Sequence, residues 1–382
     1  MSSAPLAFRG NILFGTHFEP GTVVAEGGRI VDVIRVHLRD GNLPPAVFDV
    51  DYVTPGMIDL QVNGAVGVGA DGSAANVEQI SRWSLASGVT GWLPTIVTAG
   101  ASLYPRVFGA FRDVDRSIGA TPLGLHLEGP FLSPARKGAH VLKFIEDASD
   151  ELFDSWLGEP DIRLVTLAPE REGGIDRIRR LVDRGVVVSL GHTDATLEEF
   201  AAGVDAGATK ATHLFNAMSP MHHRAPGAMI ATMLDDRVTA GIIPDAVHSH
   251  PATVRLAIRA KGPDRLAVVS DMMSATGMGP GTYDLGRQRV HVTETTARLE
   301  NGTLAGSVLT MDQAVRNLVA WGEVTPAIAV HMATRVPADL IHESERGRIV
   351  AGARADLALW DRDLRIMHTV LAGEVAWTAP GD

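Results

Sequence analysis

The chain has 382 residues, 45% of them hydrophobic, and its 34 Lys and Arg against 45 Asp and Glu give a net charge of −11. No block of basic residues offsets that charge, so a nucleic-acid groove or an anionic membrane surface is a poor expectation. The absence of cysteine excludes disulfides, thiolate metal sites and a cysteine nucleophile. Any metal must therefore be held by His, Asp or Glu.

Two features of the sequence bear on where the protein works. No apolar run reaches the roughly 18 residues of a membrane span. The first residues lack the charged, apolar and small-residue order of a signal peptide. We therefore expect a cytoplasmic protein without a membrane partner.

The two ends of the chain have a similar character. Residues 6–53 alternate short β-branched runs with turn residues, which predicts a small antiparallel β unit, and the segment from Val350 to Trp377 looks alike. We expect the two segments to pair into one satellite sheet that holds both chain ends. The predicted boundaries are residues 1–53 and 346–382 for this β-sandwich domain and 54–345 for the rest of the chain.

Between the two ends, apolar runs of strand length alternate with segments whose apolar residues recur every three or four positions. The eight runs are Pro55–Asn63, Gly91–Thr98, Leu123–Gly129, Ile162–Ala168, Val186–His192, Thr209–His213, Val238–Ile243 and Arg265–Asp271. Eight such units favour a TIM-like (β/α)8 barrel, whose active site lies at the C-terminal ends of the strands. A doubly wound open sheet is the alternative, but no glycine-rich phosphate loop follows the first run.

Ionisable side chains stand where several of these strands are expected to end. They are Glu128 in LHLEG, His192 at the end of the fifth run, His213 at the end of the sixth, His248 just past the seventh and Asp271 at the end of the eighth. Because the strand ends of a barrel converge on one mouth, we expect these side chains to meet there. One carboxylate and two imidazoles, with water in the fourth position, are typical of a catalytic zinc-type site. His126 lies one layer deeper and is expected to support a ligand.

A series of motifs in a fixed order is more specific. It consists of PGMIDLQVNG, LHLEGPF, VTLAPE, GHTDA, ATHLFNAM, the Arg224–Pro226–Gly227 loop, SDMM, GTLAGSVLTM and GRIVAGARADLALWD. Together they resemble the N-acetylglucosamine-6-phosphate deacetylases of the amidohydrolase superfamily, and LHLEGPF with ATHLFNAM separates that family from other amidohydrolases. The resemblance implies a metal-dependent hydrolase barrel with a β-sandwich from both termini. It also implies deacetylation of a phosphorylated amino sugar, in amino-sugar catabolism and cell-wall recycling.

The resemblance further implies roles for individual residues. The metal ligands would be Glu128, His192 and His213. Asp271 would be the catalytic acid/base, and His140 would reach the substrate near its acetyl carbonyl. The sugar phosphate would be bound by Asn216, Ala217, His248 and Arg224, the last contributed by the neighbouring subunit of a homodimer, and a loop around Gly306–Leu309 would cover the acetyl group. Zinc is the first expectation for the single divalent metal, with iron, cobalt, manganese or cadmium as further metals that such ligands can hold.

One departure from the wider superfamily concerns the number of metals. Many amidohydrolases carry His-x-His at the end of the first strand, whereas this chain has Gln61 and Asn63 there. Neutral amides are poorer ligands than imidazole for a borderline divalent ion. We therefore predict one tightly held metal, and a weak second ion near Glu128 and Asp271 stays open.

Three other functions are considered. A cyclic-amide hydrolase such as a dihydroorotase-like protein usually has His-x-His and often a carbamylated Lys at the end of the fourth strand, and here that strand ends in VTLAPE without Lys. A catalytically silent amidohydrolase scaffold would have lost its ligands, which are present. A metal-free phosphosugar isomerase on the same barrel would have no need of strand-end histidines.

Overall fold

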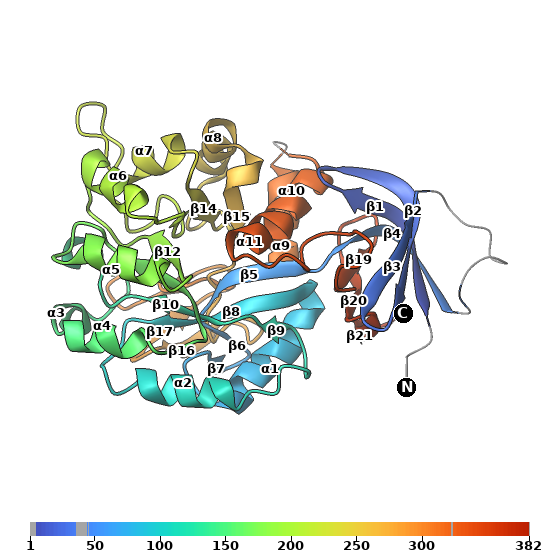
Figure 1. Ribbon diagram of the computed structural model, residues 1–382, viewed down its shortest axis with the longest axis horizontal. Helices are drawn as coiled ribbons and strands as arrows, with labels where there is room; N and C mark the ends of the chain where they lie inside the picture. The colour runs from blue at the N-terminus through green and yellow to red at the C-terminus, as the bar shows by residue number, and fades with distance from the viewer. Residues whose placement is uncertain (1–4, 36–43, 45, 322–323, 382) are drawn as a thin grey trace.

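The computed structural model describes residues 5–35, 44, 46–321 and 324–381, and the other parts of the predicted domains lie outside the described residues. It shows a barrel of parallel strands wrapped by helices, with a separate β-sheet at one end of the molecule that carries both chain termini (Figure 1). Within the described ranges, every helix is too short or too polar to cross a bilayer.

Eight parallel strands form the barrel. They are β5 (Met57–Val62), β8 (Val89–Val97), β10 (Leu125–Glu128), β11 (Ile162–Leu167), β12 (Val187–Leu190), β13 (Lys210–Ala211), β14 (Thr239–Ile242) and β15 (Leu266–Val268). Neighbours in this order are hydrogen-bonded, and a short strand, β9 (Thr121–Pro122), also pairs with β8. The chain after β15 returns to β5 through a parallel bridge between Val62 and Met272. The predicted (β/α)8 barrel is thus confirmed, and the open sheet is not formed.

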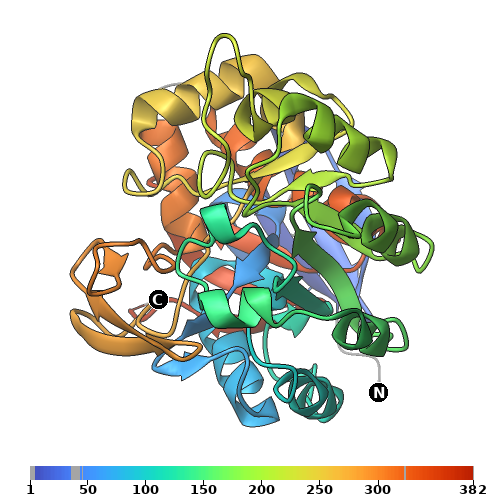
Figure 2. The same cartoon turned by 90° about the vertical axis from the view of Figure 1, so that its left-hand side faces the viewer.

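Helices cover the outside of this barrel (Figures 1 and 2). Their bounds are α1 (Ala74–Ser84), α2 (Tyr104–Arg112), α3 (Leu142–Glu146), α4 (Asp150–Trp156), α5 (Gly174–Val182), α6 (Leu197–Asp205), α7 (Ala228–Leu234), α8 (Pro251–Lys261), α9 (Met311–Ala320), α10 (Pro326–Ala333) and α11 (Arg335–Leu340). Local sequence explains several of their starts. At α6, for example, the Thr196 side chain accepts from the Glu199 backbone N–H, and the Glu199 side chain accepts from the Thr196 backbone N–H.

Strands from both ends of the chain form one seven-stranded sheet. They are β1 (Leu6–Phe14), β2 (His17–Glu26), β3 (Arg29–Ile34), β4 (Ala46–Pro55), β19 (Leu357–Trp360), β20 (Ile366–Leu371) and β21 (Glu374–Thr378). The sheet order is β21-β20-β19-β4-β1-β2-β3, so the antiparallel pair of β4 and β19 joins the two ends as predicted. The N-terminal part is not wholly antiparallel, because β4 pairs parallel with β1. Strand β4 leads directly into β5 of the barrel, and it runs in the same direction as its neighbour β1.

A small sheet that the sequence did not predict is inserted between β15 and α9. Its antiparallel strands are β16 (Gly281–Leu285), β17 (Gln288–Val292) and β18 (Ala297–Arg298). Its inner face packs on its own apolar cluster, which includes Met273, Val290 and Ala305. This sheet, orange in Figure 2, lies at the side of the barrel. A two-stranded hairpin, β6 (Gly64–Ala65) and β7 (Val68–Gly69), follows β5.

Candidate active site

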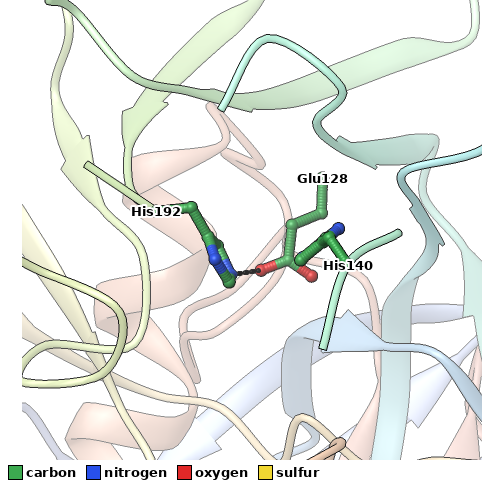
Figure 3. A group of neighbouring side chains, drawn as sticks. All are labelled: Glu128, His140 and His192. Atoms are coloured by element: carbon green, nitrogen blue, oxygen red, sulfur yellow. Dashed lines mark ion pairs between the residues drawn. The ribbon is translucent and has the colours of Figure 1, made fainter. Parts of the chain in front are cut away.

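Three candidate ligand atoms meet at the C-terminal ends of three barrel strands. Glu128 is the last residue of β10, while His192 and His213 each follow a strand by two residues, β12 and β13. Oε1 of Glu128 lies 3.1 Å from Nε2 of His213 and 3.3 Å from Nε2 of His192, and the two nitrogens are 3.1 Å apart. All three residues are buried. The structure thus brings the three predicted ligands together, and Figure 3 shows the contact between Glu128 and His192.

The spacing and chemistry of these atoms fit a divalent ion. Ligand atoms about 2.0–2.1 Å from a tetrahedrally coordinated ion lie roughly 3.3–3.4 Å apart, close to the separations observed here. Burial raises the pKa of the Glu128 carboxyl, but the adjacent imidazoles of His192 and His213 outweigh burial and bring that pKa well below its usual value. A carboxylate and two imidazole nitrogens aimed at one point repel one another unless positive charge lies between them.

A hydrogen bond to the backbone fixes the tautomer of His192. Its Nδ1 lies 2.9 Å from the carbonyl oxygen of Arg136 and donates to it. In the tautomer that makes this bond, the lone pair is on Nε2, the atom that faces Glu128 and His213. A second-sphere carbonyl of this kind is typical of histidines that bind metals.

His140 has the opposite pattern. The backbone N–H of Thr98 donates to Nδ1 of His140 at 3.2 Å, and the Thr98 hydroxyl is 2.8 Å from the same nitrogen. Because Nδ1 is an acceptor, the neutral ring carries its proton on Nε2 and can donate from there. Burial lowers the pKa of His140 to about 3, which keeps the ring neutral. One of its ring nitrogens lies within 4.8 Å of the candidate ligand atoms of Glu128 and His192 (Figure 3), but its protonation suits a donor better than a ligand.

Hydrogen bonds hold Asp271 in place where the chain after β15 closes the barrel against β5. Its Oδ1 accepts a 2.7 Å hydrogen bond from Nδ2 of Asn63, its backbone N–H donates to the Gln61 carbonyl, and its carbonyl accepts from Ser307. Burial and repulsion from Glu128 raise the pKa of Asp271 to about 7. Its φ of 52° lies in the left-handed region that favours glycine, and strained backbone of this kind is common at functional sites.

The amides that stand in place of His-x-His hydrogen-bond the two carboxylates. Nε2 of Gln61 donates to Oε1 of Glu128 at 3.1 Å, and Asn63 donates to Asp271. Each amide therefore stabilises the charged form of a carboxylate that the site uses. A single-metal site remains a prediction, and these bonds show what the two amides do in it.

The site opens into a cavity of about 480 Å³. The predicted residues that line it are Glu128, His140, His192, His213, Asn216, Ala217, His248, Asp271 and Gly306. Nδ1 of His248 donates to Oδ2 of Asp245 at 2.7 Å, and although burial opposes the charged form, this partner raises the pKa of His248. Two predicted residues do not line the cavity. Arg224 is exposed on its own loop beside His223, and Leu309 is buried, with its N–H bonded to the Ser307 hydroxyl.

The structure also places residues at the site that the sequence did not indicate. Arg136 and Arg298 both line the cavity, the first from the loop after β10 and the second from β18. The run PARKG, close to His140, could have drawn attention to Arg136, whereas no signal pointed to Arg298 because the inserted sheet was not predicted. His126 contacts Leu60 and Thr166 in the barrel interior and does not hydrogen-bond Glu128.

Comparison with known proteins agrees with this geometry. The sequence profile of the family described as the Amidohydrolase family matches residues 52–376. An N-acetylglucosamine-6-phosphate deacetylase of Lysinibacillus sphaericus is 37% identical over 329 residues, covering 85% of each chain. An N-acetylgalactosamine-6-phosphate deacetylase of Escherichia coli O157:H7 is 35% identical over 337 residues, covering 86% of this chain and 88% of that one. The crystal structure of N-acetylglucosamine-6-phosphate deacetylase from Pasteurella multocida superposes with a TM-score of 0.93 at 31% identity, covering 98% of this chain and all of that one.

Proposed function

The chain belongs to the amidohydrolase family, and we propose that it hydrolyses the acetamide of N-acetylglucosamine 6-phosphate to glucosamine 6-phosphate and acetate. The observation that carries this proposal is the convergence of Glu128, His192 and His213 beside Asp271 in one cavity. Metal-assisted amide hydrolysis uses such a set of metal ligands next to a buried carboxyl group. The named activity of relatives that span most of the chain supports the choice of substrate.

We assign the metal to Glu128, His192 and His213, with one zinc ion per chain as the first expectation. A divalent ion held there supplies Lewis-acid activation of water and of the acetamide carbonyl. The chain itself orients the three ligands: Gln61 donates to Glu128, and the Arg136 carbonyl fixes the ring of His192. Gln61 and Asn63, which stand at the His-x-His position, both hydrogen-bond carboxylates. This use of the two amides supports a site with a single tightly held ion.

Asp271 is assigned as the acid/base. One of its oxygens, Oδ1, is held by Asn63, which leaves Oδ2 to exchange protons with the substrate. As water attacks the acetamide carbon, Asp271 takes its proton, and it then returns a proton to the leaving nitrogen so that the amine departs neutral. Burial raises the pKa of Asp271 above that of an exposed carboxyl, which helps it to hold the proton and pass it to the leaving nitrogen.

We assign to His140 the stabilisation of the negative charge that develops on the acetamide oxygen. Because Thr98 occupies Nδ1, the proton on Nε2 is the one that the ring can offer. A donor that is already oriented and buried stabilises the transition state without having to reorganise. A loop around Gly306 would cover the acetyl group.

The phosphate of the substrate is assigned to Asn216, Ala217 and His248 at the cavity wall. We further propose a homodimer in which Arg224 reaches the phosphate of the neighbouring subunit, since the exposed loop that carries Arg224 does not line the cavity of its own chain. A sugar phosphate is charged and does not cross a lipid bilayer. We therefore place the reaction in the cytoplasm, where such a substrate would be formed in amino-sugar catabolism and cell-wall recycling.

The proposal is tested by measuring acetate release from the zinc-loaded protein. We expect release from N-acetylglucosamine 6-phosphate, much less from N-acetylglucosamine, and none after removal of the metal with a chelator. N-acetylgalactosamine 6-phosphate is the second candidate substrate, because one relative is named for it. Hydrolysis of dihydroorotate in its place would overturn the proposal in favour of a cyclic-amide hydrolase. A fully metallated protein that releases no acetate from either phosphorylated sugar would indicate a silent scaffold.

A further inference from the structure

The inserted sheet adds to the cavity a positive charge that the proposed reaction has not used. Arg298, the last residue of β18, is exposed and lines the cavity together with His248. Its Nη1 donates to the carbonyl of Gly302 at 2.7 Å, which anchors the side chain to its own turn. Within the described part of the chain, no carboxylate forms an ion pair with it.

Two other basic groups of the cavity, Arg136 and His248, differ from Arg298 in this respect. Arg136 pairs with Asp194 at 2.8 Å, and His248 pairs with Asp245 at 2.7 Å. The charge of Arg298 opposes protonation of His248, so the two groups lie near enough to repel each other. An anion bound between them would offset this repulsion and receive hydrogen bonds from both.

We propose that Arg298 is a specificity-determining residue that binds the phosphate of the amino-sugar substrate from within the same chain, beside His248. The inference rests on the proposed function for the identity of the anion. A guanidinium offers several N–H donors in one plane, and only one of them is engaged by Gly302, so the fork retains donors for phosphate oxygens. Each subunit would then supply an arginine to its own site, independently of Arg224 from a neighbour.

Three variants of Arg298 separate its charge from its role in the turn. Arg298→Ala removes both, Arg298→Gln keeps an N–H donor for the Gly302 carbonyl without the charge, and Arg298→Lys keeps the charge without the fork. Arg289→Ala is the matched control, because Arg289 is an exposed arginine on the neighbouring strand β17 and does not line the cavity. All four zinc-loaded proteins are compared with the wild type for acetate release and for binding of glucosamine 6-phosphate by calorimetry.

We expect Arg298→Ala and Arg298→Gln to lower kcat/KM for N-acetylglucosamine 6-phosphate by about 10- to 100-fold, mainly through KM, the usual loss for a hydrogen bond to a charged group. Turnover of N-acetylglucosamine should not change, and Arg298→Lys should restore part of the loss. An equal loss for both sugars, or full recovery in Arg298→Gln, would mean that Arg298 only holds the turn.

The binding measurement keeps this inference separate from the proposed function. If the wild type binds glucosamine 6-phosphate and Arg298→Ala weakens that binding about tenfold or more, the phosphate contact stands whether or not acetate is released. If the wild type releases acetate and Arg298→Ala matches it in both KM and product binding, the contact is refuted while the deacetylase function stands. Failure of the wild type to bind the sugar phosphate at all would refute the contact as well.

Discussion

Replacing His140 by alanine tests the division of roles that the two histidine protonation patterns predict. The His140 ring packs edge-on against His192, with centroids 4.4 Å apart, but the bond from His192 to the Arg136 carbonyl does not depend on it. The variant should therefore keep its metal. It loses one oriented donor to the acetamide oxygen, which in other enzymes contributes about 3–4 kcal/mol and corresponds to a fall in kcat of about 10²–10³.

The matched variant is His213→Ala, which removes a nitrogen 3.1 Å from Oε1 of Glu128 and leaves His192 as the one other proposed ligand beside that carboxylate. Both proteins are loaded with zinc and dialysed, and bound metal is then measured by mass spectrometry beside acetate release. We expect about one ion per chain in His140→Ala and little in His213→Ala. If His140→Ala lost the metal while His213→Ala kept it, His140 would be the ligand and the reasoning from hydrogen-bond direction would be refuted. A kcat near wild type in His140→Ala would refute its role as a donor.

Three further predictions concern the neighbouring residues. Asp271→Asn should keep metal and product binding while kcat falls by about 10²–10⁴, as expected for a lost acid/base and measured by initial rates. Arg224→Ala should chiefly raise KM for the phosphorylated sugar and reduce its preference over the unphosphorylated one. The raised pKa of His248 means that its pairing with Asp245 stabilises the fold fully below a pH of about 6.5 and loses this effect as the pH rises. Asp245→Asn should therefore lower Tm more at pH 6 than at pH 9.

Each of these predictions has a clear contrary outcome. A turnover near wild type in Asp271→Asn would remove Asp271 from the chemistry. An unchanged preference for the phosphorylated sugar in Arg224→Ala would exclude its contact with phosphate, and sedimentation of the same protein reports whether the homodimer forms. A Tm difference for Asp245→Asn that stays constant with pH would show that the backbone bonds of Asp245, rather than the charge pair, account for its effect.

The barrel and the meeting of its strand-end side chains were predictable from the sequence. Buried parallel strands are continuous apolar runs, and the barrel rule places their ends at one mouth. The positions of Glu128, His192 and His213 follow from these two facts. Their roles came from a resemblance to a known family, because spacing along strands does not distinguish a metal ligand from a hydrogen-bond donor.

Other features depend on contacts between distant parts of the chain. The Gln61 side chain is oriented toward Glu128 and the Asn63 side chain toward Asp271. Both orientations are set by packing where the chain after β15 closes the barrel against β5. Strands β16 to β18 are short and half of their residues are exposed, so they carry little of the apolar periodicity by which strands are recognised. Arg298 could not be placed without them.

The pairing of β4 with β19 has a consequence for how the protein is made. Strands β1 to β4 leave the ribosome early, whereas β19 to β21 follow only after the whole barrel has been synthesised. The apolar cluster beneath the sheet contains Phe8 and Val53 from the first group and Leu357 and Val370 from the second, so it is half-formed throughout synthesis. The early strands then present an open edge, of the kind that invites pairing with other chains. The unpaired edge of the early strands should therefore govern aggregation during expression. A chain shortened before β19 should precipitate even though its barrel is complete.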